Sequence, residues 1–575
     1  MIWELVKEQE EEKIKILQEQ LNVSKAISSL LLNRGVYDFD KAKEFFRPSL
    51  DDLHDPFLMQ DMQNAVERIQ QAIIKNENVL VFGDYDVDGT ASVALLSQYL
   101  KNYTNNKVST YIPDRYEEGY GISTKAIDFA STNNISLIIA LDCGIQAVDK
   151  IDYASEKNID FIICDHHTPS SKIPKAIAVL NPLREDCKYP FKQLCGCGIG
   201  FKLIQALNTV MDNKEELDQY LDLVSLAIVA DIVPLVGENR ILCFYGLKQT
   251  NTTPRTGLKA IIEALEKKEI TNSDLGFYIA PRINAAGRME SGNLAVELLE
   301  TEDLEKARNI AEKLNQLNIE RRMLDKTTAE EAVSQVKKQK NEKAKTTVVY
   351  NPEWHKGVIG IAASKIIDTY YRPTIVFAST GDVLVGSARS VRGFNIHDAI
   401  EKCRDFVIEF GGHKYAAGLK VKKDQYKEFK QKFEEVVSSS ISKESETKTI
   451  SIESHIELNE ITPKFYRILK QFAPFGPGNS IPIFSANNLR DTGYAKVVGK
   501  ENTHLKFNLT QQNNSKIYNA IGFGLAGKYP NVMDKKIFNA AFTLDENQWN
   551  GKTNIQLKVI AVSYTHLTLP TTPYV

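Results

Sequence analysis

Three aspartates stand at every second position in the stretch "FGDYDVDGTAS", which begins at Phe82. They are Asp84, Asp86 and Asp88, and the stretch contains no Lys or Arg to offset their charge. Crowded carboxylates raise the free energy of a fold unless a cation compensates them. The stretch begins like a calcium EF-hand loop, but its twelfth position holds Leu95 where Glu is required, and a strand-like run precedes it. A different kind of cation site is therefore expected.

Other ligand-type residues also follow apolar runs. The run "LIIALD" ends on Asp142, "FIICDHH" carries Asp165, His166 and His167, and "DQYLDLVSLAIVA" delivers Asp231. A single Asp in such a place is usually a helix N-cap, but four apolar segments that all end in ligand types are harder to dismiss. Mixed Asp and His ligands suit Mn²⁺ or Mg²⁺ better than Zn²⁺. So many carboxylates suggest two cations with one bridging acid, an arrangement that hydrolyses phosphoesters.

The elements that position these residues are predicted strands and helices in alternation. Such alternation predicts a parallel sheet, at whose carboxyl edge the ligand-type residues would converge. Side-chain alternation in an extended segment would also place Asp84, Asp86 and Asp88 on similar sides, ahead of a helix that begins near Thr90. The predicted strands are 79–83, 107–113, 136–142 and 161–165, and the predicted helices between them are 90–103, 122–133 and 147–157.

The second half of the chain shows three further patterns. A long charged helical pattern without Gly or Pro covers 303–340, and a new α/β pattern extends from 346 to about 440. A polar stretch, 438–448, looks like a hinge. The Pro- and Gly-rich segment 472–484 then leads into short strand-like pieces that predict a small β-barrel.

The predicted barrel is locally basic. Between Lys496 and Lys558 there are nine Lys, no Arg and four Asp or Glu, a formal charge of +5. Basic and aromatic residues on a small barrel suit single-stranded nucleic acid. The alternative is that half or more of the aromatic residues belong to the core and that the lysines are ordinary surface residues. Residues 563–575 continue no pattern and are expected to be a foreign or vector-derived tail. The interleaved aromatic residues are Tyr518, Phe523, Tyr529, Phe538 and Trp549.

Bulk composition sets broad limits. The chain has 575 residues, of which 43% are hydrophobic, so several domains are expected. Its net charge of −3 gives no global sign of a nucleic-acid partner. Seven scattered cysteines suggest reduced thiols, and Cys187, Cys195 and Cys197 lack the paired spacing of a zinc site. The chain shows neither a secretory signal nor an apolar run that could span a bilayer, which predicts a soluble, cytoplasmic protein.

The motifs in their order resemble a known family. "GDYDVDG", "DCG", "DHH" and "ADIVP" are similar to the motifs of the DHH phosphoesterase superfamily. "IPDRYEEGYG", "RINAAGRM", "GVIGIAASK", "GSARS" and "GGHKYAAG" narrow the resemblance, over about 20–562, to the RecJ family of bacterial single-strand-specific exonucleases. The resemblance implies an α/β fold with a parallel-sheet DHH domain, a second α/β (DHH-associated) domain and an OB-like barrel. The implied division is 1–302 for the N-terminal helices and DHH domain, 303–343 for a connecting helix, 344–447 for the DHH-associated domain and 448–562 for the barrel.

The resemblance also implies an activity and a set of site residues. The activity is 5′→3′ degradation of single-stranded DNA to 5′-mononucleotides with two Mn²⁺ or Mg²⁺ ions, in DNA repair and recombination. One metal would be held by Asp88, Asp142, His166 and Asp231, and the other by Asp86 and Asp142 with Asp84 nearby. His167 would face the scissile phosphate, so the expected catalytic residues are His167, Asp142 and Asp88. The expected substrate-binding residues are Arg115, Arg282, Asn284, Arg288, Ser387, Arg389, Gly411, Gly412 and His413.

Two other functions remain open on the sequence. One is a different DHH phosphodiesterase that acts on short oligonucleotides or cyclic dinucleotides, and the other is a DNA-binding relative without metals. The basic barrel argues against the first, and the full ligand set argues against the second. On the connecting helix, Asn315, Asn318, Arg321 and Arg322 would either line a groove for the strand or form a solvated face. The resemblance further implies a monomer that works with single-strand-binding protein and a RecQ-type helicase.

Overall fold

The structure is a computed structural model that describes residues 2–6, 9–104, 107–211, 216–339, 343–511, 516–532, 536–549 and 552–563. The chain forms two compact units. The larger, here called the catalytic unit, comprises Leu53–Val233 and Gly237–Lys448. The smaller, here called the barrel unit, comprises Met1–Asp52, Pro234–Val236 and Thr449–Val575. The suspected foreign tail lies, apart from its first residue, outside the described residues.

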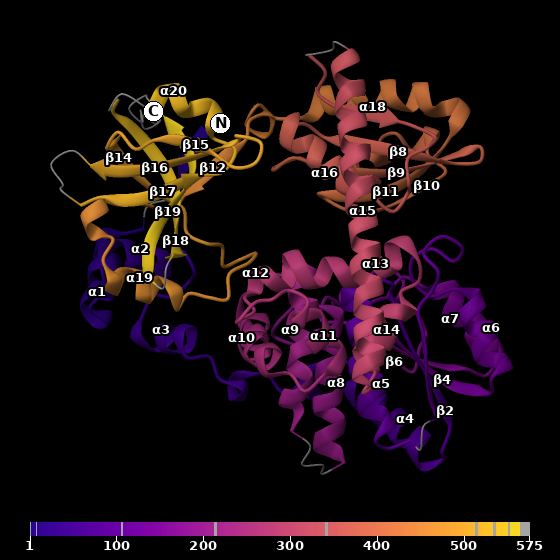
Figure 1. Ribbon diagram of the computed structural model, residues 1–575. Coiled ribbons are helices and arrows are strands. Elements are labelled where there is room, and N and C mark those ends of the chain that lie inside the picture. Colours follow the sequence, from indigo (N-terminus) through magenta and orange to yellow (C-terminus); the bar gives the residue numbers. More distant parts are fainter. Residues whose placement is uncertain are drawn as a thin grey trace, which may run out of the picture. The chain divides into compact units, whose positions relative to one another are not determined.

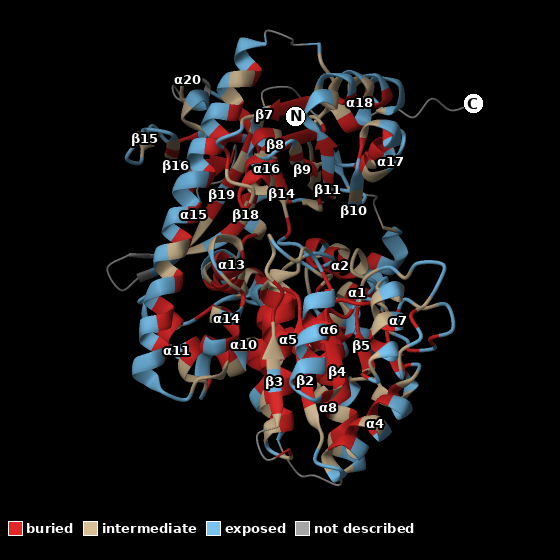
Figure 2. Cartoon of the chain, turned by 90° about the vertical axis from the view of Figure 1, so that its right-hand side faces the viewer, coloured by how far each residue is buried: buried red, intermediate tan, exposed pale blue. Residues whose placement is uncertain are grey.

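The catalytic unit contains a five-stranded parallel sheet, as the alternating pattern predicts. Its strand order is β3-β2-β4-β5-β6, and every neighbouring pair is parallel. Apart from Asn78 and Ser136, the central strands β2 and β4 are apolar, because both faces of the sheet are covered. Figure 2 shows these strands and helix α5 as buried. The strands are β2 (Asn78–Gly83), β3 (Val108–Tyr111), β4 (Ile135–Leu141), β5 (Asp160–Cys164) and β6 (Ala178–Leu180).

The order of the strands locates the site. The chain passes from β2 to β3 on one side and then crosses to β4 on the other, so the strand order reverses between β2 and β4. Ligands in open α/β sheets bind at the carboxyl ends of strands at such a switch point. Asp84 and Asp142 both follow strands that border it. The helices of this part are α4 (Met62–Ile74), α5 (Val87–Lys101), α6 (Thr124–Thr132), α7 (Val148–Glu156), α8 (Gly196–Val210), α9 (Leu221–Ala230), α10 (Gly237–Thr252), α11 (Thr256–Glu263), α12 (Asn272–Asp274), α13 (Ala280–Met289) and α14 (Asn293–Glu300).

A second sheet lies in the same unit at the far end of a long helix. Figure 1 shows α15 (Leu304–Lys338) passing from the helices around the first sheet to this second sheet. The strand order is β10-β11-β9-β8-β7, with β7 and β8 parallel and the other pairs antiparallel. The elements are β7 (Thr347–Tyr350), α16 (Ile359–Thr369), β8 (Thr374–Thr380), β9 (Val383–Arg389), α17 (Ile396–Glu401), β10 (Glu409–His413), β11 (Ala416–Lys422) and α18 (Tyr426–Ser440).

The barrel unit is built around a partly closed ring of strands. Its order is β13-β14-β18-β19-β17-β16-β15, and a further pairing between β14 and β16 closes the ring. This confirms the expected OB-like barrel. Its elements are β12 (Thr449–Ile452), β13 (Ser454–His455), α19 (Pro463–Lys470), β14 (Phe484–Asp491), β15 (Lys496–Val498), β16 (His504–Gln511), β17 (Tyr518–Gly522), α20 (Tyr529–Val532), β18 (Phe538–Trp549) and β19 (Lys552–Ser563).

The N-terminal segment packs with the barrel and not with the sheet that follows it in sequence. Strand β1 (Ile2–Leu5) pairs with β12, and Leu17 and Leu30 share one core with barrel residues such as Phe484. The resemblance implies that residues 1–302 form one domain, whereas in the structure residues 1–52 belong to the barrel unit. Among the described residues, no helix is long and apolar enough to cross a membrane. The N-terminal helices are α1 (Glu11–Leu21), α2 (Lys25–Leu32) and α3 (Phe39–Phe46).

Candidate metal centre and substrate site

The three aspartates of the opening motif do not lie on one extended segment. Strand β2 ends at Gly83, and α5 begins at Val87, three residues before the expected start. Asp86 caps this helix by accepting a hydrogen bond from the Gly89 backbone N–H at 3.1 Å, and Asp88 lies in its first turn. The prediction that side-chain alternation in an extended segment places all three aspartates on similar sides is therefore wrong for Asp88. The chain has already turned into a capped helix at this residue.

Two groups of candidate ligands result. The carboxylates of Asp84, Asp86 and Asp142 form one group, whose ligand atoms lie within 4.8 Å of one another. Asp88, His166 and Asp231 form the second, and Asp142 also groups with the two histidines. Asp142 has φ +59°, a left-handed conformation that Asp tolerates better than most residues. Asp142 belongs to the first group and its Oδ1 lies 3.1 Å from His166 Nε2 of the second, so it lies where a bridging ligand would be required.

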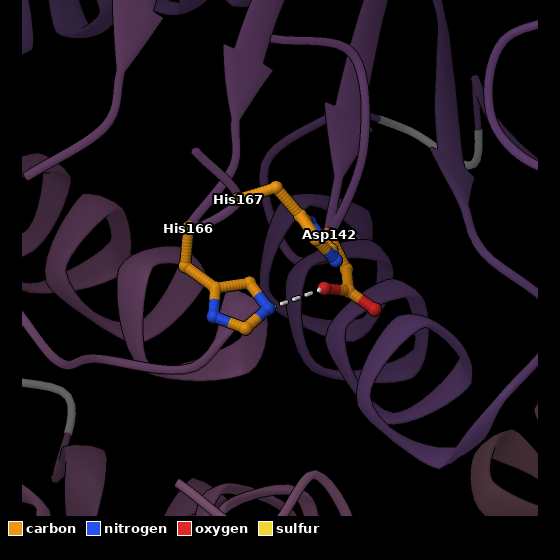
Figure 3. Close-up of side chains that lie close together, drawn as sticks. All are labelled: Asp142, His166 and His167. Carbon is orange, nitrogen blue, oxygen red and sulfur yellow. Dashed lines mark ion pairs between the residues drawn. The ribbon is translucent and has the colours of Figure 1, made fainter. Parts of the chain in front are cut away.

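His166 contacts this arrangement through Nε2. Its distance to Asp142 Oδ1 is 3.1 Å, as drawn in Figure 3, and to Asp231 Oδ2 it is 3.6 Å. In the described part of the chain, Asp142 Oδ1 and His166 Nε2 are buried without a hydrogen-bond partner, as is Asp84 Oδ1. Such atoms are costly to bury unless something satisfies them. Carboxylate oxygen and imidazole nitrogen are ligands that Mn²⁺ accepts, so the residues fit a divalent cation.

The protonation behaviour of the carboxylates leads to the same conclusion. Burial, followed by the charge of Asp86, raises the pKa of Asp88 to about 6. Burial, followed by the charge of Asp88, raises the pKa of Asp231 to about 8 and that of Asp142 well above its usual range. The acids are therefore hard to ionise together in the chain alone. A bound cation would favour the charged forms and remove this penalty.

The two histidines are in different states. Burial lowers the pKa of His166 to about 4, so its imidazole is neutral and able to ligate a cation. Burial also disfavours the charged form of His167, but the Asp165 carboxylate, 2.7 Å from its Nδ1, outweighs this and raises the pKa of His167 to about 9. Tyr120 Oη lies 3.2 Å from the His167 ring nitrogens and donates to the backbone oxygen of Asp142. The positioning roles of Asp165 and Tyr120 were not recognised in the sequence, although both lie inside quoted motifs.

A further contact that the sequence analysis missed holds Asp88 in place. The backbone N–H groups of Gly196 and Cys197, at the start of α8, donate to its two carboxylate oxygens at 2.7 and 2.8 Å. The positive end of the helix dipole adds to this. A Cβ on Gly196 would lie 2.6 Å from Asp142 Cβ, so only glycine fits there. Cys195 caps α8, and all seven cysteines are free and buried.

Basic residues from three places gather beside the metal site. Arg288 donates to the Gly357 backbone oxygen at 3.1 Å, and burial lowers its pKa to about 10, with the neighbouring Arg115 the next cause. Arg115 lies over the Tyr85 ring at 4.6 Å. Arg389 donates to Ser387 Oγ at 3.1 Å, and burial and Arg115 lower its pKa. Half-buried cations that repel one another favour an anionic ligand.

Arg282 has other partners than the arginines of this basic cluster. It donates to Asn315 on α15, and burial and Arg322 lower its pKa. On the same helix Asn318 and Arg321 are buried, with Arg321 donating to Asn318 at 2.9 Å, whereas Arg322 is exposed. The connecting helix is therefore not solvated on all sides here, and a groove for the strand along it stays a prediction.

The remaining candidates differ in their surroundings. Asn284 accepts a hydrogen bond from the Val87 backbone N–H at 3.2 Å, so its amide supports the start of α5. His413 on β10 stacks on His167 with ring centroids 6.2 Å apart. Gly412 has φ +138° and a close backbone neighbour, whereas Gly411 has open space around it.

Comparison with known proteins gives the same domain order. A model of the N-terminal domain of the DHH family matches 78–228, a DHHA1 model matches 326–439, and a RecJ OB domain model matches 452–561. The Bacillus subtilis protein named single-stranded-DNA-specific exonuclease RecJ is 34% identical over 97% of this chain and 70% of its own length.

Two solved structures of RecJ from Thermus thermophilus also match. The structure in complex with Mn²⁺ has a TM-score of 0.85 and 25% identity, and the match covers 98% of this chain and 80% of that one. The structure in complex with Mg²⁺ has a TM-score of 0.79 and 24% identity over 98% and 79%. With its three domain models, its curated relative and its site geometry in agreement, the chain belongs to the RecJ family.

Proposed function

We propose that this protein is a metal-dependent phosphodiesterase that degrades single-stranded DNA from the 5′ end to 5′-mononucleotides. The observation that carries the proposal is the pair of neighbouring ligand groups, in which Asp142 of the first lies 3.1 Å from His166 of the second, with buried ligand atoms that have no hydrogen-bond partner among the described residues. The RecJ relative is named a single-stranded-DNA-specific exonuclease. The roles in repair and recombination follow from that membership.

Two Mn²⁺ or Mg²⁺ ions would be held by the residues of the two groups. Asp84, Asp86 and Asp142 would hold one, and Asp88, Asp142, His166 and Asp231 the other. Such a pair lowers the pKa of water and stabilises charge on a phosphoryl group. Asp86 and Asp88 are fixed for this role by the start of α5 and the start of α8.

His167 would bind the scissile phosphate. Asp165 accepts from Nδ1, which orients the ring and keeps it protonated, so Nε2 is left to donate to a phosphate oxygen. Tyr120 and His413 would hold the ring on either side. A positively charged donor at this point would stabilise charge that develops in the transition state.

The basic cluster would bind the terminal phosphate of the strand. Arg115, Arg288 and Arg389 lie together, and among the described residues none of them pairs with a carboxylate. Guanidinium groups bind phosphate oxygens in bidentate fashion. Ser387 and the Gly411–Gly412–His413 segment would add further donors. Arg282 and Asn315 would contact the strand further along α15, and Asn284 would act by supporting Val87.

The barrel would bind the single strand through exposed aromatic and basic residues. Phe523 is 53% exposed, with Lys558 5.5 Å from its ring and His504 at 5.1 Å. Tyr518 and Phe538 are buried in the core, so only part of the aromatic set is available for stacking. The Trp549 side chain lies outside the described residues. Stacking combined with positive charge is typical of binding to single strands.

Several finer points belong to the same proposal. The RecJ OB domain match favours a polymer substrate over short oligonucleotides or cyclic dinucleotides, the alternative left open by the sequence. Single-strand-binding protein and a RecQ-type helicase are proposed as protein partners, and a monomer is proposed as the oligomeric state. The proposed location is the cytoplasm, because the substrate would be chromosomal DNA. The domain division is proposed as in the family, with residues 1–52 assigned to the barrel unit.

The test is digestion of strands labelled at one end. Purified protein with Mn²⁺ should release labelled mononucleotide at once from a 5′-labelled single strand and only late from a 3′-labelled one. Duplex DNA of the same sequence should remain intact. Early release from the 3′ end would refute the polarity, and binding without any digestion would refute the enzymatic function.

A further inference from the structure

A buried carboxylate on α15 has no role in the proposed function. Asp325 is 3% exposed, and its Oδ2 accepts a hydrogen bond from Lys365 Nζ on α16 at 2.6 Å. Its Oδ1 is buried and has no hydrogen-bond partner among the described residues. A buried carboxylate is costly unless it is both paired and hydrogen-bonded. The half-satisfied Asp325 therefore calls for a further cation close by.

That cation is Arg321, four residues earlier on the same helix. Residues four apart on a helix are neighbours on one face, and Arg321 is itself only 9% exposed. Burial lowers the pKa of Arg321, and the charge of Asp325 raises it. Within the described part of the chain, the Arg321 guanidinium forms no ion pair and donates to the neutral amide of Asn318. Asp325 therefore serves Arg321 as a counter-charge without a direct hydrogen bond.

Arg321 belongs with the basic cluster. Helices α13 and α15 are joined by the hydrogen bond from Arg282 to Asn315. Arg288 and Arg321 stand six residues further along these two helices, from 282 to 288 and from 315 to 321. The charge of Arg321 is a cause, after burial and Arg115, of the lowered pKa of Arg288. Arg321 thus adds a fourth guanidinium to the three of the cluster.

The helix that carries Lys365 begins at the same cluster. A Cβ on Gly360, in the first turn of α16, would lie 2.9 Å from Arg389 Nη2 and from Ser387 Oγ. Buried apolar residues of α15 and α16 also share one core. The ion pair of Asp325 with Lys365 therefore joins α15 to an element whose start is packed against the cluster.

We propose that Asp325 is a positioning residue for the basic cluster. Its charge holds Arg321 beside Arg288, and its ion pair with Lys365 fixes the carboxylate in the place from which it does so. Arg321 would then bind the terminal phosphate of the strand together with the three arginines of the cluster. Among the described residues, the Asp325 carboxylate accepts a hydrogen bond from Lys365 alone, so it acts through other side chains. The inference rests on the proposed binding of a 5′-phosphate by the basic cluster.

The experiment compares strands that differ only at the 5′ end, which carries a phosphate or a hydroxyl. The full chain is titrated with each strand in the absence of metal, so no turnover is involved. Asp325→Asn keeps the shape of the side chain and removes its charge. It should weaken binding of the 5′-phosphorylated strand by about tenfold, the effect of losing one hydrogen bond to a charged group. Binding of the 5′-hydroxyl strand should not change, and an equal loss for both strands would overturn the inference.

The matched control is Asp368→Asn, which lies on the same helix as Lys365. The Asp368 carboxylate pairs with Lys448 at 3.3 Å, and its side chain is 76% exposed. This variant changes the net charge of the chain by the same amount as Asp325→Asn. Because its surroundings are solvated and it has no counterpart to Arg321, it should bind both strands like the parent.

A double-mutant cycle separates positioning from a merely structural role. If Asp325 acts through Arg321, Asp325→Asn should cause no further loss of affinity for the 5′-phosphorylated strand in an Arg321→Gln variant. Independent structural effects would add to one another, so additive losses would overturn the inference. If Asp325→Asn does not fold, Arg321→Gln alone replaces it, and an unchanged preference for the 5′-phosphate would then exclude the proposed role.

Arg389→Lys tests the proposed function separately. If this variant keeps the parental preference for the 5′-phosphate, the assignment of the terminal phosphate to the basic cluster fails. If Arg389→Lys lowers that preference and Asp325→Asn does not, only the positioning role of Asp325 fails.

Discussion

The start of α8 provides a sharp test of how the metal site is built. Gly196 donates to Asp88 at 2.7 Å, and a Cβ in its place would lie 2.6 Å from Asp142 Cβ and 2.9 Å from Asp142 Cα. These distances are about 1 Å shorter than the roughly 3.5–4.0 Å at which carbon atoms pack. Both neighbours are main-chain or near-main-chain atoms, so the strain cannot be relieved by a side-chain rotation. Gly196→Ala must therefore displace Asp142, Asp88 or both.

The expected effects follow from that displacement. A shift of about 1 Å in a catalytic group costs about a hundredfold in rate, so kcat on a 5′-labelled single strand should fall by about that factor. Overpacking should cost about 1–3 kcal/mol of stability, which leaves the chain folded. Binding of the strand without metal should not change, because the arginines of the basic cluster have other partners than Asp88 and Asp142.

The control for this prediction lies in the same helix. Gly200→Ala places its Cβ 3.2 Å from Leu141 Cδ2, the end of a flexible side chain that can move. It should keep parental turnover and Mn²⁺ affinity. Parental turnover in a folded Gly196→Ala variant would refute the argument that this glycine sets the position of Asp142.

Four other predictions concern the rest of the molecule. Asp142→Ala should abolish turnover but leave strand binding intact, since it belongs to the first ligand group and lies 3.1 Å from His166 of the second; substantial residual digestion would disprove the bridging role. Arg389→Lys should weaken binding of strands with a 5′-phosphate by about 1.5–3 kcal/mol, and an equal loss for strands with a 5′-hydroxyl would contradict its role. Phe523→Ala should weaken strand binding by about 1–3 kcal/mol, and an unchanged dissociation constant would exclude stacking there. Arg34→Ala should destabilise the barrel unit by about 3–5 kcal/mol, because its partner Glu453 is left mostly buried and unpaired; an unchanged thermal melting curve would contradict this.

The hydrophobic core that the N-terminal helices share with the barrel also determines which variants can test strand binding. Removing the chain after about residue 450 would expose apolar residues of the N-terminal helices, such as Leu17 and Leu30, that pack in the barrel core. Loss of strand binding in such a truncation would not separate recognition from misfolding. Single substitutions on the exposed face, such as Phe523→Ala, avoid this difficulty.

The sequence alone predicted much of the architecture. Apolar runs followed by Asp or His located the carboxyl edge of the first sheet, because burial on both faces demands continuous apolar strands. The long polar helix without Gly or Pro appeared as α15. Motif order then identified the metal ligands and the basic residues as candidates, since these residue types have a limited range of chemistry.

Tertiary structure decided how those residues are held. The hydrogen bond from Gly196 to Asp88 joins residues 108 positions apart, and the backbone hydrogen bond from Leu235 to Pro477 joins residues still more distant in sequence. The N-terminal helices pack with the barrel for the same kind of reason, as their apolar faces meet a surface formed near the other end of the chain. Local patterns record which side chains are apolar, charged or able to ligate. They do not record which distant backbone groups approach them, because that depends on the packing of the whole unit.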